Sequence, residues 1–338
     1  MEPEAVLKPP PPPTSLGHRR RRRCRKKALD ELLSCKPADG DALPRRAYTL
    51  DQHCMLGRLP DLLANKVASY CALAFGDASD EVEACISAAA RACPDGLRVK
   101  ELLETFEAYR EIAAFAHTAG KVRPLDTIYD MACGHGMLGA LLAYRFPKRQ
   151  VVCVDTERRP IFDAFVNAFR EFGHAAEGED APMSNLSFEE GDALKVPLSP
   201  ACMVAAVHAC NDLARHIIEA ARAATAAWAV LPCCIRAGTY LPCRAAGTLL
   251  DDDDAKHVLY CGVVAGMFEA EAIHAIDKRI TNRNIIICGG LRLQSYAASK
   301  FMQSCGRSSE SPSSERNCLT PVRPGDEVVH VSKDGVVS

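Results

Sequence analysis

Short apolar runs alternate with longer amphipathic stretches through the middle of this chain. Six runs have the length of strands: residues 127–129, 150–155, 186–190, 203–207, 227–231 and 285–289. A helical spacing of apolar residues follows the first run and recurs over residues 213–224. Because strands that alternate with helices form mostly parallel sheets covered on both faces, the pattern predicts a doubly wound α/β fold.

Three helical stretches precede this alternation. They cover residues 51–75, 80–92 and 97–118, and the last has the spacing of a long amphipathic helix. The chain therefore divides into a helical N-terminal extension, residues 49–122, and an α/β domain, residues 123–293. We expect the extension to pack over the sheet edge or over the cleft at its end.

The two ends of the chain differ from the middle in composition. Residues 1–48 contain a polyproline run and the basic tract of residues 18–27, and residues 294–338 are polar and rich in serine. Neither end can bury a core, so we predict that both are disordered. The basic tract is typical of a nuclear or nucleolar address or of a nucleic-acid arm, whereas Glu2 and Glu4 oppose an organelle transit peptide.

Overall composition narrows the class of protein. The chain has 338 residues, 48% of them hydrophobic, and can bury one large core. Without a membrane-spanning apolar run or a signal-peptide core, it is expected to be soluble and intracellular, in the nucleus, nucleolus or cytoplasm, with organelle import left open. The 17 cysteines form no Cys-x-x-Cys pairs, which predicts neither a disulfide framework nor a structural metal. The sequence defines no oligomeric state.

The most informative segment follows the first strand and runs from Asp130 to Gly139. Its glycines let backbone N–H groups approach a ligand closely. The spacing Gly134-x-Gly136-x-x-Gly139 also fits a dinucleotide-binding loop, in which a pyrophosphate lies on a helix N-terminus. Asp130 favours a different ligand, because a carboxylate opposes a pyrophosphate but suits the ammonium and sulfonium groups of S-adenosylmethionine. An NAD-dependent enzyme is the alternative.

Two further carboxylates follow the next two strands. Asp155 ends the second strand, about 20 residues beyond the glycine loop, where a carboxylate can accept hydrogen bonds from ribose hydroxyls. Asp192 and Ala193 follow the third strand, where a short polar side chain can reach an adenine amino group. The acidic positions therefore come in the order that an adenosine-containing cofactor requires.

On these motifs, residues from about 98 to 290 resemble the class I, Rossmann-like, S-adenosylmethionine-dependent methyltransferases. Asp130-x-Ala-Cys-Gly-x-Gly136 resembles the family's first motif, although the family usually has glycine where Ala132 stands. Asp155 resembles its second motif and Asp192 its third. The resemblance implies a seven-stranded sheet, methyltransferase activity and S-adenosylmethionine as cofactor. The residues expected to bind this cofactor are Asp130, Ala132, Gly134, Gly136, Asp155, Asp192 and Ala193.

The segments after the fourth and fifth strands narrow this resemblance. His208-Ala-Cys-Asn-Asp212 follows the fourth strand, and Pro232-Cys-Cys234 follows the fifth. This combination resembles a eukaryotic group of methyltransferase-domain proteins that includes a tRNA ribose 2′-O-methyltransferase and other RNA methyltransferases. The zinc-binding modules of the tRNA enzyme have no counterpart in this sequence. The resemblance and the basic tract together favour RNA, either tRNA or rRNA, as substrate and partner.

The same segments supply the candidate catalytic residues, which are His208, Cys210, Asp212 and Cys233. Ligands of open α/β sheets bind outside the carboxyl ends of the strands, where these residues lie. His208 or Asp212 could take a proton from a hydroxyl or amine acceptor. A cysteine nucleophile would instead serve carbon five of a pyrimidine, but the cysteines can equally pack as small apolar residues. We favour an oxygen or nitrogen acceptor.

The late loop of residues 276–284 is a further candidate for substrate contacts. Arg279 and Asn282 could hold a phosphate or a base edge, or could belong to a solvated turn. Residues 1–48 hold 12 Lys/Arg and 6 Asp/Glu of the chain's 41 and 43, which leaves a body with a net charge of −8. This acidic body suits methylation of a protein or small molecule, and a catalytically silent cofactor-binding module is a third alternative.

Overall fold

The structure is a computed structural model, and it describes residues 15–34, 54–174, 181–209, 212–234 and 253–292. By its internal contacts the chain divides into two units, residues 1–294 and 295–338. All the described residues belong to the first unit. The predicted disorder of residues 294–338 lies outside the described residues.

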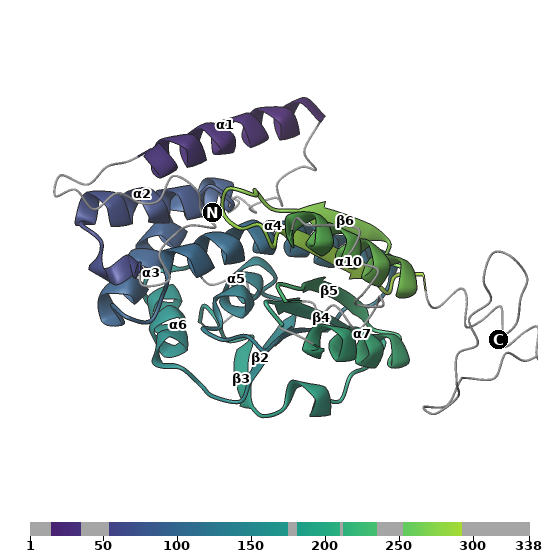
Figure 1. The fold of residues 1–338 in the computed structure, drawn as a ribbon. Helices are drawn as coiled ribbons and strands as arrows, with labels where there is room; N and C mark the ends of the chain where they lie inside the picture. Colours follow the sequence, from purple (N-terminus) through teal and green to yellow (C-terminus); the bar gives the residue numbers. More distant parts are fainter. Residues whose placement is uncertain (1–14, 35–53, 175–180, 210–211, 235–252, 293–338) are drawn as a thin grey trace, which may run out of the picture. The chain divides into compact units, whose positions relative to one another are not determined.

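One seven-stranded sheet organises this unit (Figure 1). The strand order is β3-β2-β1-β4-β5-β7-β6, and all neighbouring pairs from β3 to β5 are parallel. β7 is antiparallel to both β5 and β6. The strands are β1 (Thr127–Met131), β2 (Gln150–Asp155), β3 (Leu186–Glu190), β4 (Cys202–Val207), β5 (Ala227–Leu231), β6 (Ala272–Ala275) and β7 (Ile285–Gly289). The predicted fold class is confirmed.

Successive residues of the central strands face opposite sides of the sheet, and each side has its own core. Met203 and Ala205 of β4 belong to one apolar cluster, whereas Val204 and Ala206 belong to another. Every one of these four residues is fully buried. Burial on both faces explains why the central strands read as continuous apolar runs.

The first face is covered by the helices that precede β3. They are α2 (Asp61–Ala72), α3 (Ser79–Ala92), α4 (Val99–Val122), α5 (Met137–Arg145) and α6 (Pro160–Phe172). The long helix α4 packs against β4, β5 and β7, and α5 packs beside it. Two short 3₁₀ turns, η2 (Leu56–Arg58) and η3 (Gly76–Ala78), connect the N-terminal helices. Of the N-terminal extension, α4 thus lies on the sheet face, while α2 packs against α3 and α4 and α3 packs against α6, all in the same compact unit.

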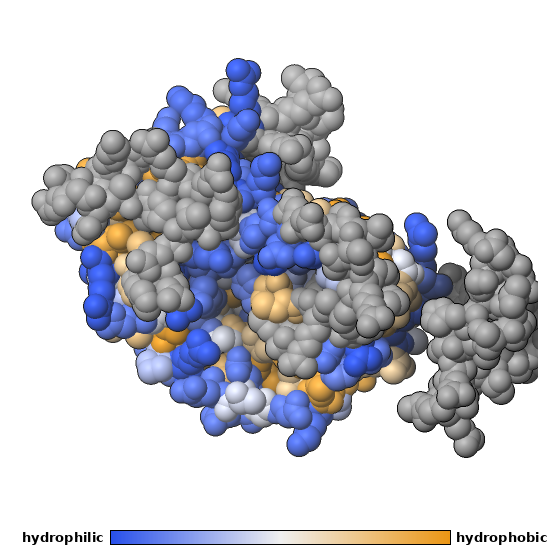
Figure 2. Space-filling view, viewed as in Figure 1, coloured by the Kyte–Doolittle hydropathy of each residue, from blue (hydrophilic) through white to orange (hydrophobic). Residues whose placement is uncertain are grey.

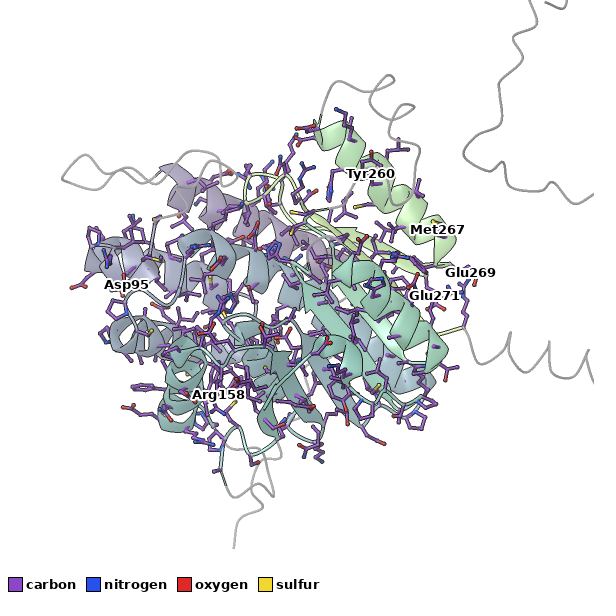
Figure 3. The ribbon with its side chains drawn as sticks, turned by 60° about the horizontal axis from the view of Figure 1, so that its bottom comes forward. Asp95, Arg158, Tyr260, Met267, Glu269 and Glu271 are labelled. Carbon is purple, nitrogen blue, oxygen red and sulfur yellow. The ribbon has the colours of Figure 1, made fainter. Side chains whose placement is uncertain are left out.

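The opposite face is covered by α7 (Leu213–Ala223) and α10 (Asp253–Met267). Trp228 of β5 is fully buried beneath these helices. The 3₁₀ turn η4 (Ala193–Lys195) packs against α7 on this side. Figure 3 shows Tyr260 and Met267 along α10, and these two residues differ, since Tyr260 is buried and Met267 is 56% exposed.

The structure corrects the predicted disorder of residues 1–48 at its centre, because Ser15–Ser34 forms the helix α1. Leu29, Leu32 and Leu33 stand at helical spacing and are buried in the same core as α2 and α4. The basic composition of this segment hid the short apolar stripe at its C-terminal end. The other residues of this predicted tail, 1–14 and 35–48, lie outside the described part.

Within the described residues, no helix combines the length and the apolar character that crossing a membrane requires.

The burial of α4 against the sheet leads to a stability prediction. Leu102 of α4 is fully buried, whereas Leu62 of α2 is 73% exposed. We expect Leu102→Ala to lower the free energy of unfolding by about 2–5 kcal/mol, through lost burial and the cavity left behind. Leu62→Ala, the matched control, should change it by less than about 0.5 kcal/mol. Urea denaturation followed by circular dichroism measures both, and equal losses would contradict the packing described.

Candidate functional site

The carboxyl ends of β1, β2, β3 and β4 meet along one edge of the sheet. The chain leaves β1 toward β2 on one side, while β4 lies on the other side of β1. The strand order therefore reverses between β1 and β4, and open α/β sheets bind their ligands in the crevice formed at such a point. The predicted cofactor and catalytic residues of the first four strands lie at these strand ends or just after them.

The loop after β1 is built from left-handed backbone conformations. Ala132, Gly134 and Gly136 have φ angles of 54°, 58° and 71°. The position of Ala132 thus has the conformation that glycine adopts most easily, which accounts for glycine being usual there in the resembling family. A Cβ atom on Gly136 would stand 2.3 Å from the ring of Phe162, so a side chain is excluded there.

Phe162 is itself held in place beneath the loop. Arg158, just before α6, places its guanidinium 5.0 Å from the centroid of the Phe162 ring and 5.6 Å from that of Phe188 (Figure 3). The Phe162 and Phe188 rings meet edge to face with centroids 5.1 Å apart. This stack closes one side of the loop and sets its distance from α6.

Asp130 ties the end of β1 to the beginning of α5. Its Oδ2 accepts a hydrogen bond of 2.9 Å from the backbone N–H of Gly139, and the side chain is buried. Burial raises the pKa of this carboxyl group to about 7, and the nearby Asp155 also raises it, while the hydrogen bond from Gly139 opposes the shift. A Cβ on Gly139 would stand 2.1 Å from Sγ of Cys153, so this glycine permits α5 to lie on the strands.

The second predicted carboxylate lies across the same loop. Asp155 Oδ2 accepts a hydrogen bond of 2.7 Å from the N–H of Gly134, and its Oδ1 accepts one of 2.7 Å from Thr156. Gly191 N–H donates to the carbonyl of Asp155 at 2.8 Å and so joins the end of β3 to the end of β2. The ends of the first three strands are thereby linked.

Asp192 and Ala193 lie at the start of the turn η4. Asp192 Oδ1 accepts a hydrogen bond of 3.0 Å from Leu194 N–H, which caps the turn that Ala193 begins. The structure therefore gives Asp192 a structural role in addition to the predicted one. Space lies open beside Gly134 and Gly191, where an added Cβ would meet no atom within 4 Å.

His208 ends β4 in a left-handed conformation, with φ of 64°, which is rare for a residue with a side chain. Its backbone N–H donates to the carbonyl of Leu231 at 3.1 Å, so the conformation is held by β5. Its ring Nε2 stands 3.0 Å from Oε2 of Glu104. Backbone strain held by its surroundings is concentrated at functional sites.

Glu104 was missed by the sequence analysis, and the structure brings it to His208. Its side chain is 4% exposed, and besides His208 it faces Lys100 Nζ, 3.7 Å from Oε1. A carboxylate this deeply buried is stable only beside positive or donor groups. Its sequence signal is a row of glutamates on α4 at intervals of three, three and four residues, namely Glu101, Glu104, Glu107 and Glu111.

A second histidine, His135, was also missed because it occupies a variable position of the glycine motif. Its Nδ1 accepts a hydrogen bond of 3.2 Å from Met137 N–H. Burial lowers the pKa of His135 to about 4, and the neighbouring Arg159 and His208 lower it further. His135 is therefore neutral near pH 7 and lies within electrostatic reach of His208.

The structure describes the surroundings of the remaining predicted catalytic residues only in part. Cys210 lies outside the described residues. Asp212 is half-buried just before α7. Cys233 follows β5 and is half-buried, with its Sγ 3.6 Å from Sγ of the exposed Cys234. Their catalytic roles stay predictions.

The candidate substrate loop lies at the same edge of the sheet, because β7 begins where the parallel strand β5 ends. Arg279 makes hydrogen bonds of 2.9 Å and 2.7 Å to Asp277 and pairs with Asp30 of α1. Asn282 donates to Asp254 at 2.8 Å. Both predicted contact residues are thus engaged within the protein by carboxylates, and the phosphate or base contact predicted for them stays a prediction.

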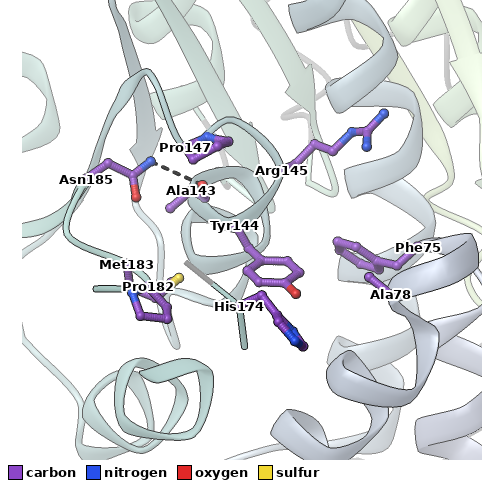
Figure 4. Close-up of a pocket in the computed structure, with 10 residues that line it drawn as sticks. All are labelled: Phe75, Ala78, Ala143, Tyr144, Arg145, Pro147, His174, Pro182, Met183 and Asn185. Atoms are coloured by element: carbon purple, nitrogen blue, oxygen red, sulfur yellow. Dashed lines mark hydrogen bonds between the residues drawn. The ribbon is translucent and has the colours of Figure 1, made fainter. Parts of the chain in front are cut away.

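A separate cavity lies at the amino edge of the sheet, away from the glycine loop (Figure 4). It is bounded by the end of α5 and the segment before β3, where Asn185 Nδ2 donates to the carbonyl of Ala143 at 3.1 Å. Its lining residues are Phe75, Ala78, Ala143, Tyr144, Arg145, Pro147, His174, Pro182, Met183 and Asn185. None of the predicted site residues is among them.

A family model matches the part of the chain that carries this site. Residues 99–237 match a family model described as a methyltransferase domain, which spans α4 to the segment after β5. No curated protein matches the sequence significantly.

Three methyltransferases are among the solved structures to which this chain is similar. An O-methyltransferase family protein from Burkholderia thailandensis is 15% identical with a TM-score of 0.31, and the match covers 57% of this chain and 59% of that one. Mitomycin 7-O-methyltransferase is 16% identical with a TM-score of 0.33, covering 77% and 74%. Human N-acetylserotonin methyltransferase, solved with S-adenosylmethionine, is 13% identical with a TM-score of 0.28, covering 66% and 70%. This chain thus spans about three fifths of the Burkholderia protein.

The sheet order and the glycine loop agree with the methyltransferase-domain match over residues 99–237, and the order of the acidic positions favours S-adenosylmethionine as the cofactor of that domain. The match decides against the dinucleotide alternative that the glycine spacing left open. The residues fit the cofactor, since carboxylates lie at the carboxyl ends of β1 and β2 and just after β3, and open space adjoins Gly134 and Gly191. Asp130 would face the ammonium end, Asp155 the ribose and Asp192 the adenine.

The raised pKa of Asp130 predicts a pH dependence of cofactor binding. Below about pH 7 the carboxyl group is mostly protonated and cannot attract an ammonium group, so affinity should rise as the pH rises through 7. We expect S-adenosylhomocysteine, which carries the same amino-acid end, to bind on the order of 10-fold more tightly at pH 8 than at pH 6. Isothermal titration calorimetry measures this difference. Asp130→Asn should bind weakly with a flat profile; a flat wild-type profile would contradict the assignment.

Proposed function

We propose that this protein transfers a methyl group from S-adenosylmethionine to an oxygen or nitrogen atom of RNA, either tRNA or rRNA. His208 is the general base in this proposal, and Glu104 positions it. The observation that carries the proposal is the 3.0 Å approach of His208 Nε2 to Glu104 Oε2 at the carboxyl end of β4.

The two ring nitrogens have different tasks in this proposal. Nε2 is buried and lies 3.0 Å from Glu104 Oε2 without the alignment of a hydrogen bond, and a proton on Nε2 leaves Nδ1 as an acceptor. The Glu104 carboxylate then stabilises the positive charge that develops when the ring takes a second proton. His208 is 28% exposed at its side chain, so an acceptor group can reach it, whereas Glu104 is shielded.

The proposed step needs one proton transfer. Bound S-adenosylmethionine supplies a methyl group on a positively charged sulfur. His208 Nδ1 takes the proton of the acceptor hydroxyl or amine as the acceptor's lone pair attacks that methyl group; the bond between the methyl carbon and sulfur breaks, and S-adenosylhomocysteine leaves. The loop after β1 and the end of β4 hold cofactor and base on adjacent strands, which supplies the orientation that the displacement requires.

An oxygen or nitrogen acceptor is favoured over carbon. Attack through carbon five of a pyrimidine requires a cysteine thiolate activated by a neighbouring positive charge or base. His208 has a carboxylate partner suited to taking a proton from a hydroxyl or amine.

RNA as the substrate is supported by the motif resemblance and by the basic tract of residues 18–27, which belongs to α1. Proteins and small molecules remain the alternative substrates. A further alternative is a cofactor-binding module that no longer catalyses methyl transfer.

Substitutions at His208 and Glu104 separate catalysis from cofactor binding. We expect His208→Ala to lower kcat by about 10²–10⁴-fold, because the proton acceptor is lost. Glu104→Gln should lower kcat by a smaller factor, on the order of 10-fold, and change the pH profile of kcat. The affinity for S-adenosylhomocysteine should stay within about twofold in both, since neither side chain is assigned to the cofactor.

Glu101→Gln is the matched control. Glu101 lies one turn before Glu104 on α4 and pairs with Arg98 at 2.9 Å, with 34% of its side chain exposed. It should retain full activity. An active His208→Ala enzyme would exclude His208 as the base.

Transfer of labelled methyl groups tests the substrate class. Incubation of the protein with radiolabelled S-adenosylmethionine and cell extract, followed by separation into RNA, protein and small molecules, should place the label in RNA. His208→Ala serves as the background control. Label confined to protein or to small molecules would overturn the RNA assignment, and no label above background in any fraction would favour a catalytically silent module.

A further inference from the structure

The helix α1 has two faces of different character. Leu29, Leu32 and Leu33 are buried against the helical layer, with exposures of 1%, 2% and 5%. Arg23 and Lys27 are exposed on the side away from these leucines, where Lys27 pairs with Glu31 at 3.6 Å, and Lys26 is exposed at the border of the buried face. A helix with one anchored face presents its outer side chains in a defined direction, which a disordered arm would not do.

Arg25 fixes the rotation of α1. Its guanidinium donates to both oxygens of Glu107 at 2.7 Å and 2.6 Å, and Tyr70 Oη donates to Glu107 Oε1 at 2.6 Å. The Glu107 side chain is only 6% exposed, and burial raises its pKa against the opposing effect of Arg25. A buried carboxylate with these donors holds the arginine strongly, because loss of either partner would strand a charge.

A second contact joins α1 to the loop between β6 and β7. Asp30 pairs with Arg279, which also contacts Asp277 at 2.7 Å. The positive charge of Lys26 contributes to the lowered pKa of Asp277, so this lysine lies close to the same loop. Two attachments, one to α4 and one to the loop, therefore hold the C-terminal half of α1.

These attachments place α1 beside the proposed acceptor site. Glu107, which holds Arg25, lies one helical turn after Glu104, which faces His208. The loop that holds Asp30 lies at the carboxyl edge of the sheet, where β5 ends and β7 begins. In the view of Figure 2, hydrophilic residues gather where Figure 1 shows α1.

The charge balance of the chain makes this helix stand out. Outside residues 1–48 the chain carries 37 acidic and 29 basic residues, so its body repels a polyanion. Arg23, Lys26 and Lys27 provide positive charge where an acceptor would approach. Phosphate contacts of this kind position a nucleic acid without reading its sequence.

We propose that the outer face of α1, formed by Arg23, Lys26 and Lys27, binds the phosphate backbone of the RNA acceptor next to His208. Arg25 and Glu107 anchor this face and do not contact RNA. This inference rests on the proposed RNA methyltransferase function and adds the surface by which the substrate is held. RNA is favoured over an acidic peptide because regularly spaced phosphates match cations on successive turns of a fixed helix.

The test compares two variants with the same change in charge. Arg23→Gln/Lys26→Gln/Lys27→Gln removes the outer face of α1. Lys121→Gln/Lys148→Gln/Arg170→Gln removes three exposed cations near the opposite, amino edge of the sheet. Binding of a fluorescein-labelled, unmodified tRNA transcript is followed by fluorescence anisotropy at several salt concentrations. Calorimetry with S-adenosylhomocysteine confirms that both variants are folded.

We expect the α1 variant to bind the transcript about 10-fold or more weakly at about 0.1 M salt, and its plot of log affinity against log salt to lose about two to three units of slope. The control variant should match the wild type. Equal affinity and slope in both variants would overturn the proposal. Tighter wild-type binding to phosphatidylserine vesicles or polyglutamate than to the transcript would overturn the choice of RNA.

The variant Glu107→Gln provides a second, independent test of the proposed RNA surface. This change weakens the ion pair between Glu107 and Arg25, so α1 should be held less firmly. The salt-dependent affinity for RNA should then fall severalfold, while the affinity for the cofactor is kept.

Failure of the two proposals can be told apart. A wild type that methylates RNA but binds it equally well in both triple variants overturns only the α1 surface, whereas a wild type that binds RNA through α1 but transfers no label to it overturns the proposed function.

Discussion

The buried carboxylates of α4 are the constraint on which the functional half of this structure depends. Glu104 and Glu107 lie one turn apart, and each is 6% exposed or less at its side chain. A carboxylate in that position must be paired, so each recruits a positive or donor group from a distant part of the chain. Glu104 contacts His208 at the end of β4. Glu107 accepts hydrogen bonds from Arg25 of α1 and Tyr70 of α2. One helix thereby connects the sheet edge, the proposed base and the proposed substrate surface.

On the cofactor side of the site, the backbone conformation determines the shape of the binding loop. The loop after β1 passes through three left-handed residues and is held by Asp130 and Asp155, whose carboxylates accept N–H groups of Gly139 and Gly134. These contacts join the ends of neighbouring strands and leave the backbone beside Gly134 open to a ligand. Sheet and loop thus form the cofactor site, while α4 and α1 shape the side from which an acceptor approaches.

Most of the fold could be predicted from the sequence because its signals are local. Continuous apolar runs mark strands buried on both faces, as in β4, and glycine at fixed offsets marks a loop that few other residues can form. The edge strand β6 was not predicted, since half of its four residues are exposed and it lacks an apolar run. The helix α1 was not predicted because eight Lys and Arg residues outweigh its three buried leucines in composition.

The sequence by itself determined the class of fold, the glycine loop and the order of Asp130, Asp155 and Asp192, since each depends on residues close together in the chain. Only the tertiary structure decided which distant groups meet. The pairs His208 with Glu104, Arg25 with Glu107 and Arg279 with Asp30 join segments separated by about a quarter to three quarters of the chain, and no local pattern specifies them. The three pairs form for the same physical reason, because a charged group removed from water needs a partner of opposite charge. The fold decides which partner lies within reach.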